Sequence, residues 1–297
     1  MSRFPARRGL LAGALLLAAA AQMAGTPGAA SATGAATGRV VDVVIGEGGL
    51  SAPSTLPEGA VTLRVRSTRP AVALLLVRLR TGHSLDVYLR DLVLTSSLDL
   101  EERKAASRAV EAAADQFGGA VVTSAAVVAC TQVLPHGRYY LVAFEYSSAT
   151  ATPIVREVSV EGFGGRAYPA VDGSIVHRRA GTHTRLEVSG ADLPGHGRFR
   201  VFNASGGLNE AVFVPVAPGT TEDEVRAVFD ALRNGTPPPS MPFRGRPVGL
   251  APLSPGRSAV LHVELPAGPY LLLSHIVDPR TGHPRAYDGA FHLTSLT

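Results

Sequence analysis

The chain has almost no cysteine, and this limits how its fold can be stabilised. Cys130 is the single cysteine of the 297 residues, so an intramolecular disulfide is excluded. It lies in an apolar, strand-like run over residues 127–130, which favours a buried, unreactive thiol over a metal ligand or an intermolecular disulfide. We therefore expect a hydrophobic core, and not a disulfide framework, to hold the mature chain together.

Long apolar runs are also absent after the N-terminus, where the sequence has the features of an export signal. Arg3, Arg7 and Arg8 precede a short apolar run over residues 9–21, and Ala30-Ser31-Ala32 forms a small-residue cleavage site. A membrane helix needs roughly 20 apolar residues, so no transmembrane segment is expected in the mature chain. Cleavage after Ala32 predicts a secreted or extracytoplasmic protein. The paired arginines leave both the general secretory and the twin-arginine route open.

A clustered basic face is not evident, because most of the net positive charge lies in the signal. The formal net charge of +4 falls to about +1 without the three signal arginines, since residues 1–32 contain no acid. Lys104 is the only lysine of the chain. Nucleic-acid binding needs clustered positive charge. We therefore expect a protein or envelope partner of unknown identity, and no nucleic acid.

Two similar segments indicate an internal repeat. Leu134-Pro135-His136-Gly137-Arg138-Tyr139 and Leu265-Pro266-Ala267-Gly268-Pro269-Tyr270 each precede an apolar run. Alternating apolar residues and Gly- and Pro-rich turns predict strands before and after both segments, as in a β-sandwich. The tyrosine after each turn suits a sandwich corner in which its hydroxyl bonds nearby backbone. We predict a flexible leader at 33–38 and two β-rich domains, 39–160 and 161–297.

Each domain is expected to contain one small inserted helix. The first would begin after Asp99, carry an apolar stripe that reaches Phe117, and end at Gly118-Gly119. The second would begin after the capping residue Thr221 and end at Gly235. The proline-rich segment 235–256 is interpreted as a surface loop, because proline disfavours helices and central strands. A polyproline stretch that binds a partner is the alternative for this segment.

The second half resembles cupredoxin-like domains of exported bacterial proteins. The resemblance lies in residues 203–212, which read NASGGLNEAV, and in Tyr270-Leu271-Leu272-Leu273-Ser274. In that family a strand opens with a His-Glu pair, and a Leu-Pro-x-Gly-x-Tyr turn leads a later strand into cysteine. The resemblance implies an all-β fold of two tandem Greek-key β-sandwich domains, the first of them divergent. It also implies export.

The copper ligands of that family are mostly missing at the matching positions. The resemblance places Asn209 and Ser274 where the family has histidine and cysteine, while His283 remains and Ala290 replaces methionine. A blue-copper site needs one thiolate and two imidazoles, which these side chains cannot supply. The first domain has Val72 and Ala143 at its corresponding positions. We therefore predict no metal site and no cofactor.

Motifs for enzymatic chemistry are not found. The sequence has no Gly-x-Ser-x-Gly elbow and no Gly-x-x-x-x-Gly-Lys phosphate loop. Ser274 and His275 are neighbours on an expected strand, so their side chains point to opposite faces and cannot pair directly. The leading hypothesis is an exported, soluble, non-enzymatic binding or structural module at the cell envelope or outside the cell. The alternatives are a copper-binding or electron-carrier protein that uses His283 with other histidines, and an envelope hydrolase.

Overall fold

The computed structural model describes residues 39–146, 152–190 and 193–297. The predicted export signal at 1–32 and leader at 33–38 lie outside the described residues. None of the helices in the described part of the chain combines the length and apolar character that crossing a membrane requires.

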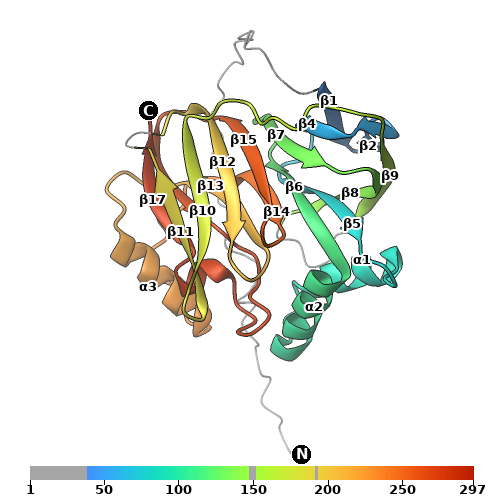
Figure 1. The fold of residues 1–297 in the computed structure, drawn as a ribbon. Helices are drawn as coiled ribbons and strands as arrows, with labels where there is room; N and C mark the ends of the chain where they lie inside the picture. Colours follow the sequence, from blue (N-terminus) through green and yellow to red (C-terminus); the bar gives the residue numbers. More distant parts are fainter. Residues whose placement is uncertain (1–38, 147–151, 191–192) are drawn as a thin grey trace, which may run out of the picture.

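Two β-sheets packed face to face form the molecule (Figure 1). The first half contributes β1 Arg39–Gly46, β2 Gly49–Ser51, β3 Thr55–Pro57, β4 Gly59–Ser67, β5 Val72–Leu79, β6 Ala114–Val122, β7 Val128–Leu134, β8 Gly137–Glu145 and β9 Ile154–Glu161. The second half contributes β10 Gly173–Ala180, β11 His183–Ser189, β12 His196–Ala204, β13 Asn209–Pro215, β14 Val248–Leu253, β15 Ser258–Glu264, β16 Gly268–Leu273 and β17 Phe291–Leu296. The helices are α1 Leu85–Leu94, α2 Leu100–Ala113 and α3 Glu222–Arg233, with a short 3₁₀ turn at Arg285–Asp288. The expected all-β sandwich with small inserted helices is therefore confirmed.

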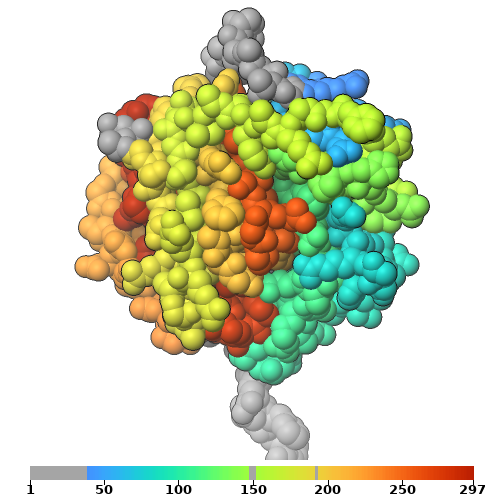
Figure 2. Space-filling model, in the orientation of Figure 1, coloured from blue at the N-terminus to red at the C-terminus, as the bar shows by residue number. Residues whose placement is uncertain are grey.

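Both sheets run through both halves of the chain. The eight-stranded sheet has the order β11-β10-β12-β15-β7-β4-β1-β2, and the nine-stranded sheet has the order β17-β16-β13-β14-β6-β5-β8-β9-β3. We call the line where the halves meet the seam: β7 pairs with β15 in one sheet, and β6 pairs with β14 in the other. Figure 2 shows the cyan and green first half meeting the yellow and orange second half along the middle of this face.

The strand order is symmetric about the seam. In the eight-stranded sheet, the order outward from the seam is β7-β4-β1-β2 in the first half and β15-β12-β10-β11 in the second half. These strands correspond one to one. Cys130 and Leu261, which lie four residues before the two similar turns at Leu134 and Leu265, are register partners of each other across the seam. A pairing between corresponding residues is the pattern of a two-fold relation between like units. The boundary between residues 160 and 161 stays a prediction, because the shared sheets give neither half its own separate edges.

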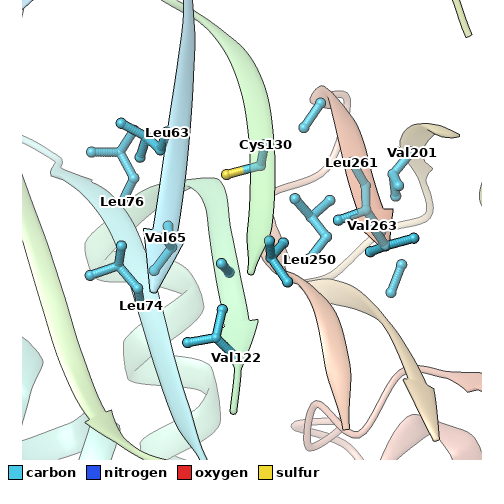
Figure 3. Close-up of a cluster of buried hydrophobic side chains, with 14 of the residues drawn as sticks. Leu63, Val65, Leu74, Leu76, Val122, Cys130, Val201, Leu250, Leu261 and Val263 are labelled. Carbon is cyan, nitrogen blue, oxygen red and sulfur yellow. The ribbon is translucent and has the colours of Figure 1, made fainter. Parts of the chain in front are cut away.

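The main hydrophobic core fills the space between the two sheets. Its members come from both halves and include Leu63, Leu74, Leu250 and Leu261. Figure 3 shows Cys130 among these side chains, between residues of β4 and β5 on one side and residues of β15 on the other. Burial raises the pKa of the Cys130 thiol to about 12, so the prediction of a buried and unreactive thiol agrees with the structure.

The two corner tyrosines make the hydrogen bonds expected of them. Tyr139 donates its hydroxyl to the carbonyl oxygen of Pro135 at 2.8 Å, and Tyr270 donates to that of Pro266 at 3.0 Å. Each bond ties the start of a core strand to the turn before it. The repeated turns therefore build the same local structure twice.

The helix prediction for the first half was partly wrong. The helix α2 begins after Asp99 as expected, but it ends at Ala113, and Phe117 belongs to the strand β6. An additional helix, α1, was not predicted. Gly119 has a φ of 130°, and a Cβ there would clash with the carbonyl oxygen of Leu74 on β5. This glycine therefore serves the close approach of two strands and not the end of a helix.

The second helix was predicted correctly at its start, whereas the segment after it was not. Thr221 caps α3 by accepting a hydrogen bond from the amide of Glu224 at 3.2 Å. The segment 235–256 is a loop at first but contains β14, a central strand at the seam. Pro252 lies where the register of β13 and β14 shifts, between the pairs that involve Leu250 and Leu253. Proline is tolerated at such an irregularity.

Candidate functional site

A cavity of about 450 Å³ lies at the seam, on the helix-covered side of the nine-stranded sheet. We call it the seam cavity. Its floor is formed by residues of β5, β6, β8, β13 and β14, namely Ala73, Leu75, Gln116, Phe144, Glu210 and Pro252. Both halves therefore build it, and neither would enclose it alone.

Helices and a C-terminal hairpin cover this floor. The wall from the first half comes from α1, α2 and the turn between them, and includes Leu92, Leu98, Arg103 and Val110. The wall from the second half comes from the end of α3 and from residues 275–287. Leu98 lines the cavity and yet is 66 % exposed, which places the entrance beside the turn between α1 and α2.

A contact between the halves holds this cover in place. The guanidinium of Arg103 donates hydrogen bonds to the carbonyl oxygens of Gly282 and Ser97. Nearby, Arg285 is 7 % exposed and forms ion pairs with Asp278 at 3.1 Å and with Glu111 of α2 at 3.2 Å. Because Arg285 and Asp278 are buried and paired with each other, losing one partner would leave the other uncompensated. The network thus fixes α2 against the C-terminal hairpin.

Glu210 brings a carboxyl group into the floor of the cavity. Its side chain is 2 % exposed, and Oε1 accepts hydrogen bonds from the Tyr146 hydroxyl at 2.7 Å and from the backbone amide of His275 at 3.0 Å. Burial outweighs these two bonds and raises the pKa of Glu210 to about 7. The carboxyl therefore exchanges its proton near neutral pH.

Two histidines next to Glu210 are neutral under the same conditions. His275 lines the cavity, and burial lowers its pKa to about 4. His177 is fully buried in the main core, where its Nε2 lies 2.9 Å from the backbone oxygen of Glu210, and burial lowers its pKa to about 4 as well. Neither imidazole therefore supplies a positive charge to the carboxyl.

Gln116 offers a second acceptor in the floor. It is 1 % exposed, and its amide nitrogen donates to the hydroxyl of Tyr88 at 3.1 Å. Among the described residues, its Oε1 has no hydrogen-bond partner. A buried acceptor without a partner is costly, so this oxygen is suited to a donor that enters the cavity.

The residues predicted to match the copper ligands do not come together as a site. Ser274 and Ala290 are adjacent, with the amide of Ser274 donating to the Ala290 oxygen at 3.0 Å. The side-chain amide nitrogen of Asn209 instead donates to Ser205 Oγ at 2.7 Å, and Asn209 does not line the cavity. His283 lies in that wall, stacked on Tyr287 with ring centroids 6.3 Å apart. In the described segments, no group of three or more His, Cys, Asp or Glu side chains could hold a metal ion.

Glu210, Gln116 and Tyr146 are site residues that were not predicted from the sequence. A signal was present for Glu210, because this acid directly precedes the apolar run 211–216. An acid that continues a fully buried strand is rare unless it has a role. For Gln116 and Tyr146 the sequence carries no such signal, since the pairing of β6 with β14 and of β5 with β8 brings them to the cavity.

Comparisons with known proteins add information on the fold. No family model and no curated protein matches the chain. Among solved structures, auracyanin from Roseiflexus castenholzii is 19 % identical with a TM-score of 0.26, and the match covers 42 % of this chain and 96 % of auracyanin. Auracyanin B is 20 % identical, with a TM-score of 0.25 and coverage of 44 % and 93 %. A copper-containing nitrite reductase from Thermus scotoductus is 12 % identical, with a TM-score of 0.23 and coverage of 87 % and 61 %.

These neighbours are cupredoxin-like folds. They belong to the group that the sequence resembles. TM-scores of 0.23 to 0.26 are low, so the comparison carries no argument about a shared copper site. The properties of the site have to come from its own residues.

Proposed function

We propose that this protein is an exported, non-enzymatic binding protein that takes a small, mostly apolar molecule into the seam cavity. The observation that carries the proposal is the cavity of about 450 Å³, with an apolar lining and a few buried polar groups. Ligand sites are typically concave, measure about 300–1,000 Å³, and contain few but well-placed polar groups. The N-terminal signal features support a place at the cell envelope or outside the cell.

The repeated architecture supports an origin by internal duplication, with two domains at 39–160 and 161–297. Corresponding strands meet at the seam, and the corner tyrosines Tyr139 and Tyr270 make the same bond. In this view each repeat contributes one side of a binding site that lies near the symmetry axis. Sites formed between two units of like fold are common places for ligands.

A non-enzymatic role is supported by the surroundings of Ser274, the serine that directly precedes His275. Its hydroxyl accepts the backbone amide of Glu210 at 3.3 Å. No hydrogen bond links it to a histidine within the described ranges, whereas a serine nucleophile needs an adjacent base. Ser274 is also fully buried, which keeps substrates away from it.

Binding of an apolar fluorescent probe tests the proposal directly. We expect N-phenyl-1-naphthylamine to bind the mature protein at one saturable site, with an increase in its fluorescence. Leu75→Trp, which fills the cavity from the floor, should abolish the signal, and Val110→Phe, which fills it from α2, should weaken it. Val171→Trp places the same bulk on an exposed linker residue and should leave binding intact. Equal binding by all four proteins, or no binding by the wild type, would overturn the proposal.

Metal analysis tests the rival function. The purified mature protein is expected to contain no stoichiometric copper or zinc after dialysis. A bound metal that is lost in His283→Ala would support the metal-carrier alternative and contradict the function proposed here.

A further inference from the structure

We propose that the ligand of the seam cavity is an apolar molecule with one protonated amine, whose ammonium group hydrogen-bonds to the carboxylate of Glu210. This inference rests on the proposed function and names the class of molecule that the same cavity takes. Three features of the cavity support it: the electrostatic isolation of Glu210, the free acceptor of Gln116, and the lining of the remaining surface.

Glu210 differs from Asp278, which is also buried, and from Glu111, which is partly exposed. Asp278 and Glu111 both pair with Arg285, and Asp278 also pairs with Arg280 at 2.8 Å. Glu210 receives two hydrogen bonds from neutral donors, and no positively charged side chain of the described chain stabilises its ionised form. A buried carboxylate without a counter-charge is unfavourable, so a cation delivered by the ligand would be bound strongly at this position.

The hydrogen-bond acceptors in the floor of the cavity also favour an amine. An ammonium group carries three N–H donors and no acceptor, while the floor of the cavity presents the Glu210 carboxyl and the unpartnered Oε1 of Gln116. A ligand with a carboxylate would instead place an acceptor against acceptors. The donors of the floor, Tyr146 and the amide of His275, are already used by Glu210.

The arginines of the wall do not reverse this preference. Arg233 forms an ion pair with Asp288 at 3.0 Å, and Arg103 donates to two backbone carbonyls. Both arginine side chains are partly exposed, so water shares in solvating their charge, although the Nε of Arg233 has no hydrogen-bond partner among the described residues. Glu210 is 2 % exposed and has no such compensation. A solvated charge gains little from a partner, whereas a buried one gains much.

The rest of the lining suits an apolar body next to the amine. Leu75, Val110, Leu208 and Ile276 contribute aliphatic surface, and Phe144 adds an aromatic ring. A chain of about eight carbons with a terminal amine would bury its ammonium at Glu210 and its methylene groups along this surface, and the burial of each methylene group would favour binding.

Three probes of equal length and different charge test the inference. 1-Octylamine, 1-octanol and octanoate would each be used at pH 7.5 to displace N-phenyl-1-naphthylamine from the mature protein. We expect octylamine to displace the dye at concentrations at least tenfold lower than octanol, and octanoate to be the weakest. Glu210→Gln keeps an oxygen for Tyr146 and the His275 amide, and it should remove the preference for octylamine over octanol. Glu264→Gln makes the same change at an exposed residue of β15 and should keep the preference.

The outcomes separate this inference from the proposed function. If octanol or octanoate displaces the dye as well as octylamine does, the cavity binds small molecules but the amine assignment is wrong. If the preference for octylamine survives in Glu210→Gln, another group recognises the amine and the inference is also wrong. If the dye does not bind the wild type, the proposed function itself fails. The comparison among the three probes needs no variant, so it remains decisive even if Glu210→Gln does not fold.

Discussion

The two halves place corresponding strands around one cavity but line it with different side chains. Leu75 of β5 pairs with Val142 of β8, and Val212 of β13 pairs with Leu273 of β16. Counting from these equivalent pairs, Ala73 corresponds to Glu210. By the same count, Phe144 corresponds to His275.

The side chains of Ala73, Phe144, Glu210 and His275 all line the cavity. The first half therefore contributes apolar surface and volume where the second contributes a carboxyl and an imidazole. Two halves with a matching strand order can therefore line one asymmetric site. The hydrogen bonds of the corner tyrosines are the same in both halves because they serve the fold. The cavity positions are free to differ because open space, and not tight packing, lies next to them. Four predictions test this contrast, beginning with the largest effect.

Ala73→Glu would give the first half the carboxyl that the second half already has. The new side chain would enter the same cavity without a counter-charge, and we expect it to lower the free energy of unfolding at pH 7.5 by roughly 3–5 kcal/mol. Urea unfolding followed by tyrosine fluorescence measures this change. Ala73→Gln has the same size without the charge and should lose much less. Equal losses in the two variants would show that size, and not charge, decides what this position accepts.

Leu261→Ala tests whether the seam joins the halves into one folding unit. Leu261 is fully buried and pairs with Cys130 across the seam, so its truncation should cost roughly 2–5 kcal/mol. We expect a single transition in urea and loss of hydrogen-exchange protection in β4 and β12 together. Val171→Ala, at an exposed linker residue, should change little. Two separate transitions would instead favour independent domains.

Glu210→Gln should change how stability depends on pH. The pKa of Glu210 is about 7 in the folded protein against an ordinary value of 4.5, so the folded state binds more protons between these values. The stability that Glu210 contributes is therefore largest at low pH and falls as the pH rises from 4.5 to 7. Between pH 4.5 and pH 8, the wild type should lose about 3 kcal/mol relative to Glu210→Gln.

His177 and His275 act in the opposite direction but cancel in this comparison. His177 and His275 have pKa values of about 4, so each favours the folded state increasingly as the pH rises from 4 to 6.5. Both are present in the wild type and in Glu210→Gln. Urea unfolding at pH 4.5, 5.5, 7 and 8 measures the difference, and parallel stability curves for the two proteins would contradict the prediction.

The helix caps give the smallest expected effects and compare the halves at one more place. Asp99 accepts two amide hydrogen bonds at 2.9 Å, from Glu101 and Glu102, whereas Thr221 accepts one at 3.2 Å. Asp99 also places a negative charge at the N-terminus of α2. We expect Asp99→Ala to cost about 1–2 kcal/mol and Thr221→Ala about 0.5–1 kcal/mol, measured by urea unfolding. The reverse order would show that the single bond of Thr221 matters more.

Local features of the chain were predictable because each depends on a few neighbouring residues. The corner tyrosines and the caps Asp99 and Thr221 follow from short sequence patterns, and the structure confirms them. The end of α2 was misjudged because Phe117 continues the apolar spacing of the helix while lying on a strand. The strand β14 was missed because the prolines around it hid a pairing that depends on β6, more than 120 residues earlier in the chain.

The amino-acid sequence by itself determined that this is a β-rich chain with a repeated turn and tyrosine, a buried cysteine, and no set of residues that matches a blue-copper site. These properties depend on residue type and short spacing. The tertiary structure alone decided that the halves share both sheets, and that Glu210, Gln116 and Tyr146 meet beneath helices from both halves. The physical reason is that a cavity and a perturbed pKa arise from long-range packing, which excludes water around a group whose own neighbours in the chain do not reveal it.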